Sequence, residues 1–81
     1  MASTKAFVLI ETAVGKTHDV VVALKGVRGV TSVDVVTGPY DIIAVLEAQD
    51  LSSVGAVVTG HVHTISGIVR TVTCLAVGGS S

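Results

Sequence analysis

Residues 20–35 (VVVALKGVRGVTSVDV) and residues 58–73 (VTGHVHTISGIVRTVT) decide the fold, because they are two copies of one pattern. In each copy apolar residues recur at i, i+4 and i+7, the spacing of one face of an α-helix. A glycine follows two residues later, and an aliphatic residue comes directly after the glycine. The aligned pairs are Val20/Val58, Leu24/Val62, Val27/Ile65, Gly29/Gly67, Val30/Ile68, Val33/Thr71 and Val35/Thr73. The sequence therefore predicts a helix, a glycine turn and a strand, used twice.

Two further strand-like segments complete the pattern, at residues 6–12 before the first copy and at residues 40–47 after it. The predicted elements are strand 6–12, helix 16–26, strand 30–36, strand 40–47, a second helix with Asp50 as its N-cap, and strand 68–77. Strands 30–36 and 40–47 are expected to form a hairpin. The order β-α-β-β-α-β predicts an α+β ferredoxin-like domain, with a four-stranded antiparallel sheet and two helices on one face.

The composition suits a small domain that is rich in strands. Of the 81 residues 49% are apolar, and these include 18 valines and five isoleucines but only one Phe, one Tyr and no Trp. Stiff β-branched side chains favour pleated strands. A chain of this size buries only about 62% of its extended surface on folding. We expect one domain over residues 1–77 and a flexible tail over residues 78–81.

Apolar residues alternate onto both faces of the predicted strands, although the helices can cover only one face. Strand 6–12 places Phe7 and Leu9 opposite Ala6, Val8 and Ile10, and strand 40–47 places Ile43 and Val45 opposite Ile42, Ala44 and Leu46. The second apolar face needs a partner. The simplest one is another copy of the chain, so a homodimer joined through its sheets, a dimeric α/β sandwich, is predicted.

Charge and segment lengths exclude several classes of partner. The net charge is −1 and the five cations are scattered along the chain, so direct nucleic-acid binding is not expected. The longest apolar runs have five residues, far short of the ~20 that a membrane helix needs. No secretory signal is visible, and a single cysteine allows no internal disulfide. These features predict a cytoplasmic location.

Candidate reactive residues do not assemble into a catalytic or metal-binding motif. His61 and His63 at i, i+2 would share a face only in an extended segment, and they fall at the end of a predicted helix. Cys74 is read as a small core residue rather than a nucleophile. Glu11 and Glu47 make no general acid–base pair, and no phosphate-binding loop is present. The sequence predicts no catalytic residue, no metal and no cofactor.

Residues with special backbone or chemical properties are most concentrated in residues 36–42, Val-Thr-Gly-Pro-Tyr-Asp-Ile. It can be a plain hairpin turn. Alternatively, backbone N–H groups around Gly38 can bind a small anionic group, with Tyr40 and Asp41 beside it, a mixture that suits a zwitterion such as an amino acid. Asp41 can equally be structural, by accepting backbone hydrogen bonds.

Residues 29–30 (Gly-Val), 36–43 (Val-Thr-Gly-Pro-Tyr-Asp-Ile-Ile) and 65–73 (Ile-Ser-Gly-Ile-Val-Arg-Thr-Val-Thr) resemble the C-terminal effector-binding (RAM) domain of Lrp/AsnC transcription regulators. The resemblance spans about residues 6–77. It implies a domain that dimerises through its sheets, forms larger rings and binds amino-acid effectors between dimers. It also implies that a ligand site is lined by Gly38, Tyr40, Asp41, Thr71 and Thr73.

Full-length members of that family carry an N-terminal helix-turn-helix, and this sequence begins at the first strand. It therefore resembles the stand-alone form, so DNA binding is not carried over. Regulation would act through ligand binding or through assembly with full-length regulators. Two other classes stay open: a small ferredoxin-like dimeric enzyme, and a structural oligomeric scaffold that needs no ligand. An enzyme is disfavoured because only Asp34 and Arg70 interrupt the apolar strand faces.

Overall fold

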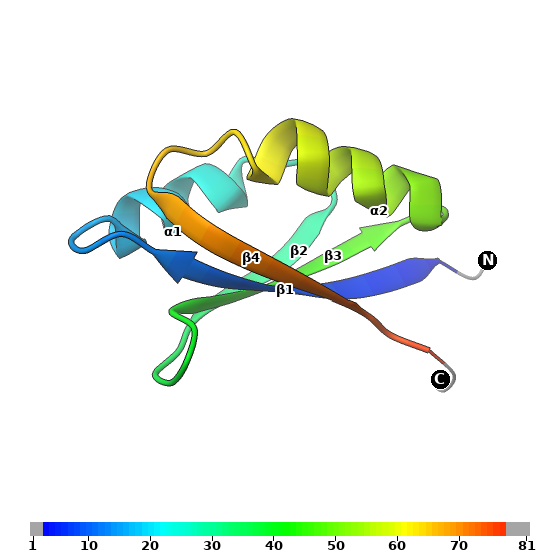
Figure 1. Cartoon of the computed structure of the whole chain (residues 1–81). Coiled ribbons are helices and arrows are strands. Elements are labelled where there is room, and N and C mark those ends of the chain that lie inside the picture. The colour runs from blue at the N-terminus through cyan, green and yellow to red at the C-terminus, as the bar shows by residue number, and fades with distance from the viewer. Residues whose placement is uncertain (1–2, 78–81) are drawn as a thin grey trace.

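The structure is a computed structural model that describes residues 3–77 (Figure 1). The elements are β1 (Thr4–Thr12), α1 (Thr17–Lys25), β2 (Val30–Val35), β3 (Ile42–Ala48), α2 (Leu51–Val57), the π-helix η1 (Val58–Val62) and β4 (Ile68–Leu75). Their order is the predicted one, and the boundaries of the strands and of the first helix agree with the prediction to within two residues. The tail predicted at residues 78–81 lies outside the described residues.

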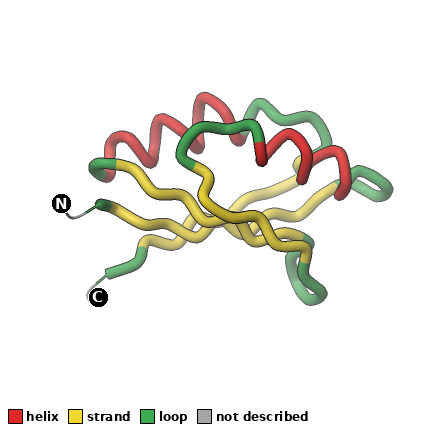
Figure 2. The backbone as a smooth tube through the Cα atoms, turned by 180° about the vertical axis from the view of Figure 1, so that it is seen from behind, coloured by secondary structure: helices red, strands yellow, loops and turns green. Residues whose placement is uncertain are grey.

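All neighbouring strands are antiparallel, in the order β2-β3-β1-β4. Strands β1 and β3 are therefore central, and β2 and β4 are the edges. Both helices lie on one face of a strongly twisted sheet, and no helix or strand of residues 3–77 lies on the opposite face (Figures 1 and 2). The ferredoxin-like α+β fold is confirmed.

The internal repeat is visible in the turns that lead from each helix into the following strand. Gly29 and Gly67 both have a φ of 99°. The Gly29 carbonyl accepts a hydrogen bond from the Glu47 amide at 2.9 Å, and the Gly67 carbonyl accepts one from the Ala13 amide at 2.8 Å. A positive φ of this size is readily available only to glycine. The matched glycines of the sequence therefore occupy equivalent backbone turns.

The core lies between the helices and one sheet face. Its buried residues come from alternate positions of β1 and β3 and from one stripe of each helix: Ala6, Val8, Ile10, Val20, Leu24, Ile42, Ala44, Leu46, Val54, Val58 and Val62. In the sheet register Val8 lies beside Ala44, and Ile10 beside Ile42. The side chains at every second position of the strands thus pack against the helix side chains spaced by four residues, and together they form one buried layer.

The second helix changes its winding so that three valines stay on one side. Val54, Val58 and Val62 are four residues apart, and at about 100° per residue each step of four turns the stripe by about 40°. From Val58 the helix is a π-helix, in which the amide of His63 donates to the carbonyl of Val58 at 2.9 Å. The wider turn offsets that drift, and all three valines are buried.

Asp50 caps the second helix, as predicted. Its carboxylate accepts a hydrogen bond from the Ser53 amide at 2.8 Å. This hydrogen bond lowers the pKa of Asp50 from its usual value, because it stabilises the charged form. The carboxylate stays ionised at neutral pH and satisfies an amide at the start of α2.

The other face of the sheet is apolar and only partly covered within one chain. We call it the uncovered face: Phe7, Leu9, Ile43, Val45, Val72 and Cys74. The first four are half-buried by their own neighbours, whereas Val72 and Cys74 are exposed. The prediction that Cys74 is a core residue is wrong, because β4 is an edge strand and Cys74 pairs with Phe7 on the side away from the helices.

Candidate functional site

The loop between β2 and β3 carries three of the five predicted site residues. It bends away from the helices, past the plane of the sheet (Figures 1 and 2). The amide of Val36 donates to the carbonyl of Asp41 at 2.9 Å and closes the loop. Gly38 at its tip has a φ of 156°, with no heavy atom within 4 Å of where a Cβ would lie. The loop backbone is thus open to a ligand or a second molecule.

Asp41 fixes this loop to the first strand. Its Oδ2 accepts hydrogen bonds from the Thr12 amide at 2.9 Å and from the Thr12 hydroxyl at 3.2 Å. Its own amide donates to the carbonyl of Ile10 at 2.9 Å. The Thr12 hydroxyl also lies 2.7 Å from the Thr17 hydroxyl at the start of α1. One carboxylate oxygen therefore links the loop, β1 and α1, which supports the structural role of Asp41 left open by the sequence.

Asp41→Ala is expected to destabilise the domain by about 2 kcal/mol, because a half-buried amide and hydroxyl lose a charged acceptor. The corresponding fall in Tm is about 8–16 °C for a domain of this size. Thermal unfolding followed by circular dichroism measures it. Asp41→Asn is the matched control, since its amide oxygen can still accept from Thr12, and it should recover part of the loss. An unchanged Tm for Asp41→Ala would remove the structural role.

Tyr40 belongs to a second cluster, whose other members the sequence analysis did not select. The Arg70 guanidinium lies 5.4 Å from the centre of the Tyr40 ring and donates from Nη2 to the Tyr40 hydroxyl at 3.4 Å. Its Nε lies 3.5 Å from Oε1 of Glu11. Glu11 and Arg70 are register partners on β1 and β4, on the same side of the sheet as the uncovered face. A carboxylate, a guanidinium and a phenol thus lie together at one end of the uncovered face.

Thr71 and Thr73 point to the other side of the sheet. In the register Thr71 lies beside Ile10 and Thr73 beside Val8, both of which face the helices. The Thr71 hydroxyl lies 3.0 Å from Nε2 of His63. Within one chain the five predicted residues therefore do not form one site: Gly38, Tyr40 and Asp41 share a loop, and the two threonines lie across the sheet from it.

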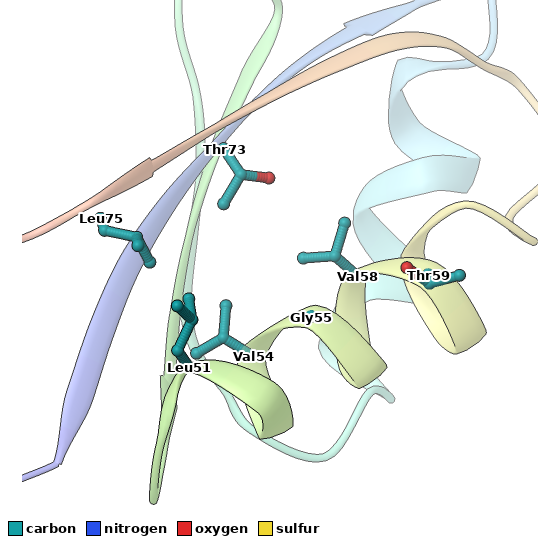
Figure 3. Close-up of a pocket in the computed structure, with 7 residues that line it drawn as sticks. All are labelled: Leu51, Val54, Gly55, Val58, Thr59, Thr73 and Leu75. Atoms are coloured by element: carbon teal, nitrogen blue, oxygen red, sulfur yellow. The ribbon is translucent and has the colours of Figure 1, made fainter.

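Thr73 lines a groove between the second helix and β4 (Figure 3). The groove has a volume of about 230 Å³. Its lining is mostly apolar: Leu51, Val54, Gly55, Val58, Thr59, Thr73 and Leu75. It is open because α2 packs mainly over β3 and β1, which leaves the helix-facing side of the edge strand β4 partly free.

Side chains of the types that bind metals are dispersed over residues 3–77. No three side chains of His, Cys, Asp or Glu in that range lie together as a metal site would require. Of the predicted His pair, His63 contacts Thr71 through its ring, and His61 lies within η1. No helix in the described part of the chain has the length and apolar character needed to cross a membrane.

Comparison with known proteins assigns the chain to a family. The family model described as the Lrp/AsnC ligand binding domain matches residues 5–78. The chain belongs to the Lrp/AsnC ligand-binding domain family, as the resemblance implied. A search of curated proteins finds no match.

Three solved structures illustrate the similarity. TTHA0845 from Thermus thermophilus is 32% identical, with a TM-score of 0.91 over 96% of this chain and 98% of that one. The hypothetical protein PHS023 from Pyrococcus horikoshii is 30% identical, with a TM-score of 0.86 over 94% of this chain and 92% of that one. The transcriptional regulator NMB0573 from Neisseria meningitidis, solved as a complex with L-Met, shares the fold at 13% identity, with a TM-score of 0.83 over 93% of this chain and 50% of that one.

Proposed function

We propose that this chain is a non-catalytic, oligomeric module that binds a free amino acid and acts in transcription regulation. Membership of the ligand-binding domain family supports the general class. The L-Met complex of a protein with the same fold supports an amino acid as the ligand class. Regulation would follow either from ligand sensing by the module itself or from its assembly with full-length Lrp/AsnC regulators in the cytoplasm, without direct contact to nucleic acid.

The observation that carries the proposal is the pair formed by Glu11 and Arg70 beside the Gly38 loop. Their 3.5 Å separation places a negative and a positive group side by side, as the charges of a zwitterion require of a receptor. Both side chains are accessible, with exposed fractions of 42% for Glu11 and 59% for Arg70. An exposed ion pair contributes only about 0–1 kcal/mol, so opening it for a ligand costs little.

Each charged group then has a defined partner on the ligand. The planar guanidinium of Arg70 keeps free N–H donors for bidentate binding of the α-carboxylate. Glu11 accepts from the α-ammonium, and the ring of Tyr40, whose centre lies 5.4 Å from the Arg70 guanidinium, limits where the ligand lies. Asp41 acts here as a positioning residue through Thr12, and Gly38 leaves room for the ligand.

The site is open on one side in a single chain, so we propose that assembly completes it. Two copies would join through the uncovered face to give the dimeric sandwich, and dimers would join further into a ring. Such contacts would bring another copy over the Tyr40 loop and remove the ligand from water. They could also bring Thr71 and Thr73 of one copy into a site shared between copies.

Thermal-shift measurements with the twenty amino acids test this function. A ligand at 100 times its Kd should raise the stability by about 2.7 kcal/mol. The best amino acid is then compared with its N-acetyl and its amide derivative, each of which lacks one charge and should lose most of the effect. No stabilisation by any amino acid at millimolar concentration would contradict the proposal and favour a scaffold that needs no ligand.

Arg70→Ala and Glu11→Gln are expected to weaken the binding at least tenfold by calorimetry, because a hydrogen bond to a charged group contributes about 1.5–3 kcal/mol. Lys25→Ala is the matched control, since this cation lies at the end of α1 on the helix side of the sheet. Unchanged affinity in both site variants would place the ligand elsewhere. Turnover of a bound ligand would instead favour the dimeric enzyme, although the cluster holds no nucleophile activated by a neighbouring base.

A further inference from the structure

Strand β4 is an edge strand whose outer side is unpaired within residues 3–77. It pairs with β1 alone. The amide of Ala76 donates to the carbonyl of Lys5 at 2.9 Å, so these opposite residues form a hydrogen-bonded pair. Hydrogen-bonded and non-bonded pairs alternate along an antiparallel ladder, so every second residue of β4 before Ala76 also bonds to β1. The residues between them have amides and carbonyls that point away from β1, past the edge of the sheet: Thr71, Thr73 and Leu75.

The groove between α2 and β4 lies directly beside this free edge. In the first copy of the internal repeat α1 packs closely on the edge strand β2, whereas α2 packs mainly on β3 and β1. Gly55 has no side chain to fill the groove that it lines, and nothing lies within 4 Å of where its Cβ would be. The second copy of the repeat therefore leaves a hollow where the first copy has helix packing.

The groove has the size and the lining of a site for apolar side chains. Leu51 and Leu75 at its opening are 60% and 41% exposed (Figure 3). Large apolar side chains left partly in water around a hollow are typical of a surface that receives another apolar group. The volume of about 230 Å³ is below the roughly 300–1,000 Å³ of typical small-molecule pockets. It suits one or two apolar side chains of a polypeptide better than a whole ligand.

A strand added antiparallel to β4 would direct one side chain into this groove. Its residue opposite Thr73, which we call the anchor, would exchange two backbone hydrogen bonds with Thr73. Residues that lie opposite each other in paired strands have their side chains on the same face of the sheet, and Thr73 faces the helices. The anchor side chain would therefore enter the groove. The residues next to the anchor in sequence would point to the other face.

Charges at the two ends of β4 match one direction of the added strand. Asp50 directly precedes Leu51 at one end of the groove, and the hydrogen bond from Ser53 lowers the pKa of Asp50 and keeps it charged. At the other end Lys16 lies against Gly67, since a Cβ on Gly67 would be 3.0 Å from the Cβ of Lys16. An antiparallel strand would begin at the Asp50 end. A basic residue before the anchor and an acidic residue after it would therefore complement both charges.

We propose that an extended segment of another protein adds to β4 as a fifth, antiparallel strand, with an apolar anchor in the groove, a basic residue before it and an acidic residue after it. In this mode of recognition the main-chain hydrogen bonds supply affinity and the side-chain pockets supply specificity. The groove is on the helix side of the sheet, so a dimer joined through the uncovered face leaves it accessible. The module would thereby recruit a partner protein, whichever ligand it binds.

Fluorescence anisotropy with labelled peptides tests this contact. The probes are Lys-Thr-X-Thr-X-Thr-Glu peptides with Val, Leu, Ile, Met or Phe at both X positions, the second X being the anchor. At least one should bind saturably, and exchanging its Lys and Glu should weaken binding about threefold at low salt. Methylation of the anchor amide removes a hydrogen bond to Thr73 and should weaken binding at least tenfold. Methylation of the preceding amide, which points away from β4, is the matched control and should change little.

A pair of glycine variants tests the groove from the protein side. Gly55→Leu fills the groove and should weaken binding of the best peptide at least tenfold. Gly60→Leu is the matched control, because Gly60 lies in η1, does not line the groove and also has nothing within 4 Å of where its Cβ would be. This variant should bind like the wild type. Circular dichroism checks that both variants are folded.

Hydrogen exchange followed by NMR gives an independent readout. The amides of Thr71, Thr73 and Leu75 should exchange fast in the free protein and slowly with the best peptide bound. The proposal is overturned if no peptide of the set binds, if Gly55→Leu and Gly60→Leu bind alike, or if the two methylated peptides bind alike. It is also overturned if these three amides are already protected in the free protein, as pairing of two copies through β4 would make them.

Discussion

Gly67→Ala is expected to lower the free energy of unfolding by about 3 kcal/mol, because backbone strain and a steric overlap act together at this position. At a φ of 99° an L-residue costs about 1–2 kcal/mol of backbone strain. The added Cβ would also lie 3.0 Å from the Cβ of Lys16 and 3.1 Å from Cγ2 of the buried Val20. Overpacking of this kind costs about 1–3 kcal/mol. The expected fall in Tm is about 12–24 °C.

The internal repeat supplies a matched control. Gly29→Ala imposes the same φ of 99°, but its Cβ would meet the nearest atom, the carbonyl oxygen of Glu47, at an ordinary 3.5 Å. Gly15→Ala, at a φ of 78° with no atom within 4 Å, isolates the backbone strain. Chemical denaturation should give a much lower free energy of unfolding for Gly67→Ala than for Gly29→Ala and Gly15→Ala. Equal losses of unfolding free energy in Gly67→Ala and Gly29→Ala would mean that Lys16 and Val20 move away from the new methyl group. The loss would then come from backbone strain alone.

The order of elements was predictable because two independent periodicities agreed along the chain. Valine-rich segments such as residues 20–22 favour strand by propensity, but the i, i+4, i+7 spacing from Val20 indicates a helix, and the structure has one. The second copy at residues 58–73 supported the same choice. The π-helix could not be predicted from the sequence alone, because the spacing of four between Val54, Val58 and Val62 also fits an ordinary helix until the sheet fixes which side is buried.

The candidate site was less predictable because it depends on strand register. The sequence identified the loop that contains Gly38 and Tyr40, since turn residues are local. The pairing of Glu11 with Arg70 joins residues 59 positions apart, and it follows only from the alignment of β1 with β4. The same register places Thr71 and Thr73 on the face of the sheet that the helices cover. Cys74 was misplaced for a related reason: an apolar setting in the sequence does not tell a central strand from an edge.

Val45→Asp on the uncovered face is expected to separate the proposed dimer. Val45 lies beside Phe7 in the sheet register, at the middle of this face. A two-fold axis would place the substitution twice in one interface, and burying an unpaired carboxylate costs several kcal/mol. We expect the Kd of the dimer to rise at least 100-fold, about 2.7 kcal/mol, as measured by sedimentation. The Tm should fall as well, because dissociation leaves the apolar face in water.

Val35→Asp is the control that tests whether the rise in the Kd of the dimer comes from a carboxylate in the interface or from any aspartate placed in a strand. Val35 is on β2 of the same sheet and is 63% exposed, and it lies beside Ile42 on the side that faces the helices. This variant should remain a dimer. Cys74 offers a second readout, since it is exposed in the single chain and lies on the uncovered face. Its reaction with a thiol reagent should be slow in the wild type and fast in Val45→Asp. A Val45→Asp protein that still sediments as a dimer, with Cys74 reacting fast both in this variant and in the wild type, would show that the copies associate through another surface and leave the uncovered face in water.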